Sequence, residues 1–155
     1  MRRKDREQTD PAAMEAIIRR CTVCRLGMVD GDQPYVIPIS FGYRDRVVYL
    51  HCAHEGRKID VLKQHPKVCI EWDIDTVLVP AAEAHQYTQK FRSVIAFGTA
   101  SFVTEPNAKR RALDVLMAQY AEGSFAYPDN QVDRTCIIRI DISKMTGKQS
   151  GWGQE

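Results

Sequence analysis

The alternation of apolar and polar residues predicts that this chain is built mainly of antiparallel strands. In the clearest strand, one face carries Tyr35, Ile37, Ile39 and Phe41, and the other carries Val36, Pro38 and Ser40. The apolar run from Val47 to His51 predicts the next strand, after a tight turn. Thr22 to Val29 is the preceding strand, and Asp30-Gly31 predicts the hairpin turn because both residues tolerate positive φ.

Three further strands are predicted in the second half of the chain: Val68 to Trp72, Phe91 to Val103 and Thr135 to Ile142. The turns between the early strands are too short for parallel crossovers. We therefore expect a six-stranded antiparallel β-barrel with flanking helices, in the α+β (mainly β) class. The segment from Asp73 to Lys90 is expected to be a long connection that holds a turn of helix at Ala81 to Tyr87.

Capping residues and helical periodicity predict three helices. Asp10 is suited to cap the first helix, with Pro11 at its first position, and Gly56-Arg57-Lys58 opens the second. Pro66 ends the second helix, because the residue before a proline disfavours helical backbone angles. The expected bounds are Pro11 to Arg20, Ile59 to Gln64, and Pro106 to Gly123.

Length and composition predict a single globular domain over residues 1–155. The chain is 44% hydrophobic and 27% charged, which is ordinary for a soluble protein. Residues 1–9 are expected to form a basic N-terminal tail, because four of them are Arg or Lys. Residues 143–155 are expected to form a flexible C-terminal tail, since three glycines lie there.

The charge balance and the cysteines limit the partners and the compartment. A net charge of +2 gives no support to a nucleic-acid partner. No apolar run reaches the ~20 residues of a membrane span and no signal-peptide core is present, so we expect a cytoplasmic location and no membrane. The five cysteines are expected to be free thiols without disulfides, with Cys24, Cys69 and Cys136 buried.

Gly56, Arg57 and Lys58 form the strongest candidate binding site. A helix N-terminus offers unpaired N–H groups and the positive end of the helix dipole. Two cations in the first turn are unfavourable beside that dipole, unless an anion binds there. The sequence therefore predicts a phosphate at the start of the second helix.

The segment His51-Cys52-Ala53-His54 is a second candidate. Two histidines and a thiol could bind a metal or haem iron, or a histidine could donate a proton beside a cofactor. A closed zinc site needs more ligands, and Cys21-Thr-Val-Cys24 would present its thiols to opposite faces of a strand. We therefore expect no metal site and place His51 and His54 beside the cofactor; His85 has no assigned role.

Five segments together point to a known family. They are CRLGMVDGDQPYVIPISFGY, VVYLHCAHEGRKIDVLKQHPKVCIEWD, KFRSVIAFGTASFV, AKRRALDVLMAQY and IIRIDISKMTGKQSG. In their order and spacing they resemble the FMN-binding split-barrel proteins related to pyridoxamine 5′-phosphate oxidase, and within them the nitroimidazole-resistance (Nim) branch. The resemblance covers nearly the whole chain.

The resemblance implies a homodimer of six-stranded split barrels with two FMN molecules at the interface, each touched by both chains. The FMN-binding residues that it implies are Gly56, Arg57 and Lys58 at the phosphate, Arg92 and Ser93 as further contacts, Val36, Ile37, Pro38 and Ile39 along the isoalloxazine ring, and Tyr49, Leu50 and His51 at the strand edge beside it. It assigns no catalytic residue, and His51 and His54 are the candidates.

The function that follows is an FMN-dependent oxidoreductase that reduces a small electron-poor substrate of the nitroaromatic or quinone kind. The connection around Val77 to Tyr87, with Trp72 and Trp152, is expected to shape the substrate pocket, and a place in the core is the equal alternative for Trp72. The Arg-Leu-x-Pro motif of the vitamin oxidases is missing from the C-terminus, so pyridoxamine phosphate is not the expected substrate. The alternatives are a haem-binding or haem-handling protein, a non-catalytic flavin-binding redox module, and a deazaflavin in place of FMN.

Overall fold

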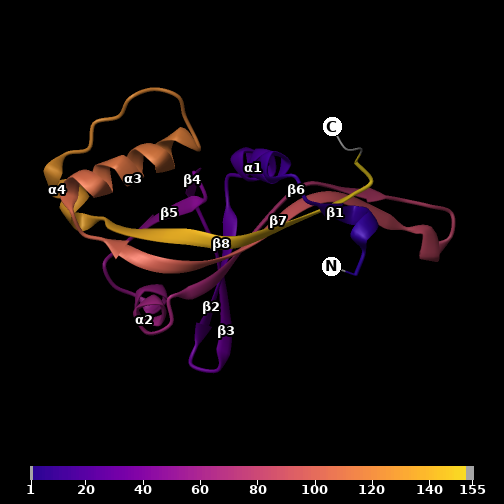
Figure 1. The fold of residues 1–155 in the computed structure, drawn as a ribbon, viewed down its shortest axis with the longest axis horizontal. Coiled ribbons are helices and arrows are strands. Elements are labelled where there is room, and N and C mark those ends of the chain that lie inside the picture. Colours follow the sequence, from indigo (N-terminus) through magenta and orange to yellow (C-terminus); the bar gives the residue numbers. More distant parts are fainter. Residues whose placement is uncertain (1, 153–155) are drawn as a thin grey trace.

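The computed structural model describes residues 2–152 (Figure 1). Its elements are η1 (Lys4–Arg6), β1 (Glu7–Gln8), α1 (Pro11–Arg20), β2 (Cys24–Asp30), β3 (Gln33–Ile39), β4 (Gly42–Arg44), β5 (Val47–Cys52), α2 (Arg57–Gln64), β6 (Lys67–Val79), η2 (Ala84–Gln86), β7 (Thr88–Val103), α3 (Pro106–Ala118), α4 (Asp129–Arg134) and β8 (Cys136–Ser150).

The strands form one antiparallel sheet in the order β3-β2-β6-β7-β8-β5-β4, with β1 paired to β8 outside this path. Figure 1 shows β7 and β8 running through the middle of the molecule, with the β2–β3 hairpin projecting from one side and α3 and α4 at one end. The mainly β, α+β class is as predicted. The sheet has eight strands rather than six, because β1 and β4 are too short to show an alternating pattern.

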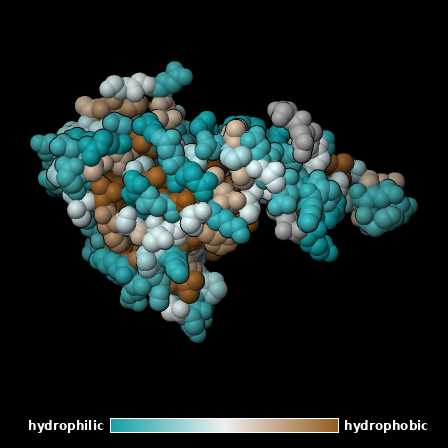
Figure 2. All heavy atoms as spheres, in the orientation of Figure 1, coloured by the Kyte–Doolittle hydropathy of each residue, from teal (hydrophilic) through white to brown (hydrophobic). Residues whose placement is uncertain are grey.

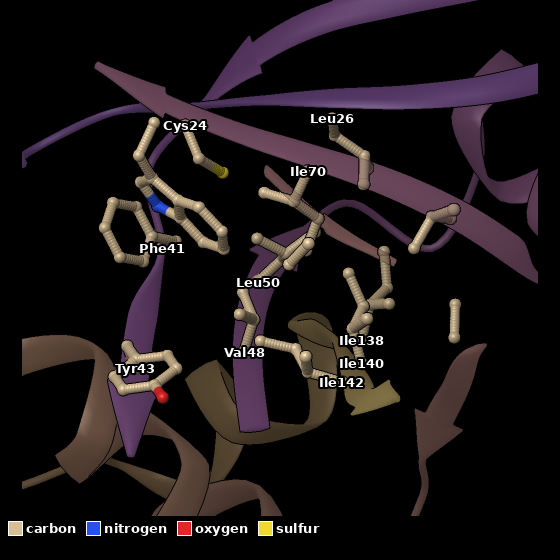
Figure 3. Close-up of a cluster of buried hydrophobic side chains, with 14 of the residues drawn as sticks. Cys24, Leu26, Phe41, Tyr43, Val48, Leu50, Ile70, Ile138, Ile140 and Ile142 are labelled. Carbon is tan, nitrogen blue, oxygen red and sulfur yellow. The ribbon is translucent and has the colours of Figure 1, made fainter. Parts of the chain in front are cut away.

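The core lies inside the curled sheet, where apolar side chains from β2, β4, β5, β6, β7 and β8 meet. Figure 3 shows this cluster, and its fully buried members include Leu26, Leu50, Ile70, Ile138 and Ile140. Trp72 is also fully buried and contacts Phe41 edge-on, with ring centroids 5.7 Å apart. Of the two roles predicted for Trp72, the structure shows the place in the core and not the one in a substrate pocket.

The first two helices form where the capping signals predict them, whereas the third ends early. The carboxylate of Asp10 accepts a hydrogen bond from the Ala12 N–H at 3.0 Å and so caps α1. Helix α3 ends at Ala118 rather than Gly123, because the next two side chains bind elsewhere in the chain. The Gln119 amide donates to three carbonyls at the end of α1, and the Tyr120 hydroxyl donates to the carbonyl of Thr22.

Helix α4 has no counterpart among the predicted elements. It is a single short helix, and the buried Lys109 ammonium donates to the carbonyls of Val132 and Thr135 at its C-terminal end. These contacts stabilise the helix through α3, which a local sequence pattern does not reveal. Among the described residues, no helix is long and apolar enough to cross a membrane.

Two segments predicted to be irregular are strands. Residues 73–90 are not a long connection: β6 continues to Val79 and β7 begins at Thr88, and the turn between them holds η2. Residues 143–150 are not a tail, because β8 continues to Ser150, and residues 7–8 pair with it as β1. Met1 and residues 153–155, with Gly153, lie outside the described part of the chain.

The outer part of the β6–β7 hairpin, residues 75–92, projects beyond the sheet as a ribbon that we call the arm (Figure 1). It is two-stranded except at its base, where Phe91 and Arg92 also pair with β8. The sequence of the arm does not predict its strands, because most of its side chains are exposed, and polar and apolar residues follow each other irregularly. An isolated two-stranded ribbon is only marginally stable in water. The arm therefore depends on its attachment at the base.

Asp75 provides that attachment. It lies at the register shift in β6 and has a positive φ of 56°. Its carboxylate accepts hydrogen bonds from Arg20 of α1 at 2.7 Å and from Arg92 of β7 at 2.6 Å, and these partners, Arg20 first, lower its pKa. Its carbonyl accepts a hydrogen bond from the Trp152 indole at 3.2 Å. One residue thus joins α1, the arm and the end of the described chain.

We predict that Asp75→Asn reduces the free energy of unfolding by up to about 1 kcal/mol, since it removes the charge but keeps a residue that tolerates positive φ. The wild-type carboxylate stabilises the fold above its ordinary pKa of 3.8, and this stabilisation is lost as pH falls through the lower folded pKa. Denaturant unfolding of both proteins should thus differ at neutral pH and converge in acid. An equal difference at all pH values would contradict this role of the charge.

Candidate flavin site

The helix start at Gly56 is open, as an anion site requires. Gly56 has a φ of 119°, and no side chain caps α2. Its carbonyl accepts the first helical hydrogen bonds, from Ile59 and Asp60, so the N–H groups of Arg57 and Lys58 are not part of the helical ladder. A Cβ at this position would meet nothing within 4 Å, so lack of space is not the reason for the glycine. Gly56 is required for its positive φ, which other residues rarely adopt.

Arg57 is held in place beside this helix start by the β2–β3 hairpin. Its Nε donates to the Asp30 carboxylate at 2.7 Å, and its guanidinium lies 4.5 Å from the centre of the Tyr35 ring. The side chain is still 58% exposed, and a bond through Nε leaves the two terminal nitrogens for another acceptor. Asp30 and Tyr35 are not among the predicted site residues, since their sequence positions indicate only a turn and a strand.

Strand β3 presents the predicted ring-binding residues to two different sides. Val36 and Pro38 point outward and are exposed, whereas Ile37 and Ile39 are half-buried and pack against the core. The four residues therefore do not form one surface. Val36 and Pro38 are the two whose side chains can contact a ligand on the outer face.

The outer face around Val36 is apolar and slightly hollow. Across the sheet, Val36 pairs with Gly27, Gly27 with Cys69, and Cys69 with Phe97, so these residues form one row. Val36 is 61% exposed and Phe97 47% exposed, and the small residues between them leave a hollow of about 330 Å³. Val29 and Ile95 extend the exposed apolar surface around this row. Figure 2 shows apolar side chains gathered on the main body of the protein, while the arm is mostly hydrophilic.

The β5 residues also divide between two sides. Leu50 is fully buried and pairs with Ile138 of β8, so it presents no surface to a ligand. Tyr49 packs against the small cluster beneath α3, and its hydroxyl accepts a hydrogen bond from Arg139 at 3.0 Å. His51 is exposed, and the Nε2 of His54 lies 2.9 Å from the carbonyl of Asp133 at α4. The two histidines are therefore not brought together into one catalytic group.

Arg92 and Ser93 lie on β7 near the base of the arm. Arg92 binds Asp75 and lies over the Trp152 ring, 5.2 Å from its centre, and Ser93 is paired with Lys148 of β8. Lys148 in turn pairs with β1, and Figure 1 shows β1 and α2 on opposite sides of the molecule. Within one chain, the predicted phosphate residues thus form two separate groups.

The remaining candidates are distributed as follows. Cys24 and Cys136 are buried as predicted, but Cys69 is only half-buried because it belongs to the outer row. The five cysteines are free thiols. Over residues 2–152, no group of three His, Cys, Asp or Glu side chains is placed to bind a metal ion. His85 lies in η2 at the tip of the arm and is exposed.

Comparison with known proteins agrees with this architecture. Residues 10–149 match the family model described as pyridoxamine 5′-phosphate oxidase. A candidate 5-nitroimidazole antibiotic resistance protein from Bacteroides thetaiotaomicron is 32% identical, with a TM-score of 0.85 over 92% of this chain and 86% of that one. No match was found among curated proteins.

Two more distant structures share the fold. The flavocytochrome Anf3 from Azotobacter vinelandii is 21% identical, with a TM-score of 0.86 over 98% of this chain and 72% of that one. The FAD and heme binding protein from Mycobacterium smegmatis is 19% identical, with a TM-score of 0.86 over 97% and 76%. The split-barrel fold and the predicted resemblance are confirmed, and this chain belongs to the pyridoxamine 5′-phosphate oxidase family.

Proposed function

We propose that this protein is a flavin-dependent oxidoreductase that binds FMN at the interface of a homodimer. The observation that carries the proposal is the uncapped start of α2, where Arg57 is held beside open N–H groups by Asp30 and Tyr35. A dianionic phosphate would there accept charge-assisted hydrogen bonds, which are stronger than neutral ones. Structural neighbours named for flavin binding support the same cofactor class.

The outer face fits the flat ring of a flavin. Gly27 and Cys69 leave the row between Val36 and Phe97 low and apolar, as a planar aromatic ligand requires. Tyr35, which positions Arg57, is the neighbour of Val36 along β3 and packs against the core side, whereas Val36 and Pro38 point outward. Since β3 is the last strand in the sheet order, a bound flavin would pass around this strand edge. The residues present therefore fit both the anionic and the apolar part of FMN.

The homodimer is supported by what one chain leaves exposed. Val29, Val36, Ile95 and Phe97 form an apolar surface that a monomer would leave in water. The arm also carries exposed apolar side chains, at Val77, Leu78 and Tyr87. A second copy of the chain would cover this surface. It would also bring its own Arg92 and Ser93 to a site that they do not reach within one chain.

A bound flavin would supply hydride or electron transfer, and the chain would supply position and access. Arg57 and Lys58 would hold the phosphate, and the outer row would hold one face of the ring. The substrate we propose is a small, flat, electron-poor molecule such as a nitroaromatic or a quinone. The 32% identical neighbour, named for nitroimidazole resistance, supports the nitroaromatic class.

The absorption spectrum of the purified protein tests the cofactor. Paired flavin bands after addition of FMN, retained on gel filtration, are expected. A sharp Soret band would instead show a haem-binding protein, and retention of a deazaflavin but not FMN would change the cofactor. If the protein binds flavin tightly but shows no turnover with NAD(P)H and any of a panel of nitro compounds and quinones, it is a non-catalytic redox module.

We predict that Arg57→Ala combined with Lys58→Ala weakens FMN binding at least about 100-fold. Each charged contact to the phosphate contributes about 1.5–3 kcal/mol to binding. The loss of both contacts therefore exceeds the roughly 2.7 kcal/mol that corresponds to a 100-fold change in affinity. The measurement is FMN titration followed by absorbance or flavin fluorescence. Lys63→Ala is the matched control, because Lys63 is an exposed lysine in the last turn of the same helix. Unchanged affinity in the double variant would refute the assigned phosphate site.

We further predict that Phe97→Glu converts the dimer to a monomer and abolishes FMN retention, since a carboxylate would be buried in the apolar interface. Light scattering after gel filtration measures the mass, and the yellow colour of the peak reports the flavin. Phe125→Glu changes an exposed phenylalanine outside the sheet and should alter neither. A wild-type protein that is monomeric with bound FMN would contradict the proposed dimer.

A further inference from the structure

Cys52 and Cys136 form a cysteine pair at one end of the sheet. Cys52 is the last residue of β5, Cys136 is the first residue of β8, and the two are paired directly across the antiparallel ladder. Directly opposed residues point to the same face of a sheet. Cys24 faces Ile39, and Cys69 faces Gly27 and Phe97, so among the ladder pairs of the described residues these two cysteines alone face each other.

The register suits a disulfide bond. Opposed residues in an antiparallel pair have Cβ atoms about 4.5–5.5 Å apart, and a disulfide needs about 3.5–4.5 Å. A small inward movement of the two strands is therefore enough. Cys52–Cys136 is the last pair of the β5–β8 ladder, so the two strands are not paired with each other beyond it. The inward movement is therefore made most easily at this end of the strands.

Cys136 borders a pocket that His54 and α2 also line. A hollow of about 330 Å³ is lined by Cys136, by the apolar side chains of Ile59 and Phe102, and by the cationic side chains of Lys63 and Lys109. Cys52 is itself half-exposed. An anionic molecule with an apolar part can approach the pair through this opening, since the cations at its wall attract it.

The two thiols are suited to different steps of an exchange reaction. Burial, and next the neighbouring Cys52, raise the pKa of Cys136 to about 11, so it is the poorer first nucleophile. The half-exposed Cys52 is the thiol that a soluble disulfide reaches first. Cys136 then lies directly opposite, in the position of a resolving thiol.

We propose that Cys52 and Cys136 form a reversible cross-strand disulfide by exchange with a small disulfide of the oxidised glutathione class. The Cys52 thiolate attacks one sulfur of that disulfide, whose S–S bond breaks, and the departing thiolate takes up the proton that Cys52 lost. Cys136 then loses its proton and attacks the Cys52 sulfur, expelling the second thiolate, which takes up that proton. The protein is oxidised by two electrons, and one disulfide molecule is reduced to two thiols.

The disulfide would act on the segment that leads to the phosphate site. Residues 53–56 connect Cys52 directly to the first turn of α2. A covalent link at Cys52 holds the start of this connection against β8, which restricts how the helix start moves. The inference stands on the cysteine pair alone and holds whether or not a flavin binds.

The test is to equilibrate the full-length protein in glutathione buffers of reducing and oxidising ratio and to map its thiols by mass spectrometry after alkylation. In the oxidising buffer, free thiols should fall from five to three, and one peptide pair should be joined through Cys52 and Cys136. Adding reduced glutathione should restore all five. Five free thiols in both buffers, or a disulfide between two chains, would overturn the proposal.

Two variants separate this reaction from general thiol oxidation. Cys136→Ser should stop the reaction at a glutathione adduct on Cys52, because the resolving thiol is gone. Cys69→Ser removes another half-exposed thiol that faces no cysteine, and it should leave the Cys52–Cys136 disulfide unchanged. A stable glutathione adduct on Cys52 in the wild-type protein would show that Cys136 does not reach it and would overturn the proposal. The thiol map of the wild-type protein requires no variant, so it tests the proposal even if a variant fails to fold.

Discussion

The hydrogen-bonded ladder that joins β6, β7 and β8 is the constraint on which the rest of the molecule depends. Strand β7 pairs with β6 on one side and with β8 on the other, along most of its 16 residues. The inner end of this ladder encloses the core, and its outer end becomes the base of the arm. Because both ends belong to the same strands, the position of the arm is determined by the register that also closes the barrel.

The pleat of these strands gives the sheet two chemically different faces. Leu26, Ile70 and Ala96 point inward and are buried, while their neighbours along each strand point outward. In a sheet that faces water these outward residues would be polar. Here the row from Val36 to Phe97 is apolar and the residues between its ends are small, while the next row carries the Arg25–Glu71 ion pair beside Ile95. Such a surface gains free energy when it is covered, which is why we assign it to the cofactor and a second chain.

The short connection between β5 and α2 links two features that would otherwise be separate. On one side lies the cysteine pair at the end of β5, and on the other lies the helix start with Arg57. The hairpin residues Asp30 and Tyr35 fix the arginine from a different part of the sheet. The proposed phosphate site thus depends on tertiary contacts to both sides of the connection, and a change at Cys52 is positioned to alter it.

The sequence by itself determined the elements whose signals are local. Helix α1 follows from Asp10 and Pro11, and the open start of α2 from Gly56. The β2–β3 turn follows from Gly31, but it lies one residue later than predicted, at Gly31-Asp32, because Asp30 is still paired in β2. The family followed from the order and spacing of several segments, which together are specific although none is alone. The length of β6 and β7 was not predictable in this way, because the exposed residues of the arm lack a buried face and so show no regular alternation. The extension of β8 was not predictable because residues 143–150 are mostly polar, although most of them are buried or half-buried against β1 and β7.

Only the tertiary structure decided which of the candidate residues share a surface. The strand period separates Val36 from Ile37 and Tyr49 from Leu50, and the extended β7 carries Arg92 away from Arg57 within one chain. The pairing of β5 with β8 also places Cys52 opposite Cys136, although the two cysteines are 84 positions apart in the sequence. The physical reason is that capping and turn formation depend on neighbours within a few residues, whereas pairing register and facing depend on contacts that form only when the whole sheet closes.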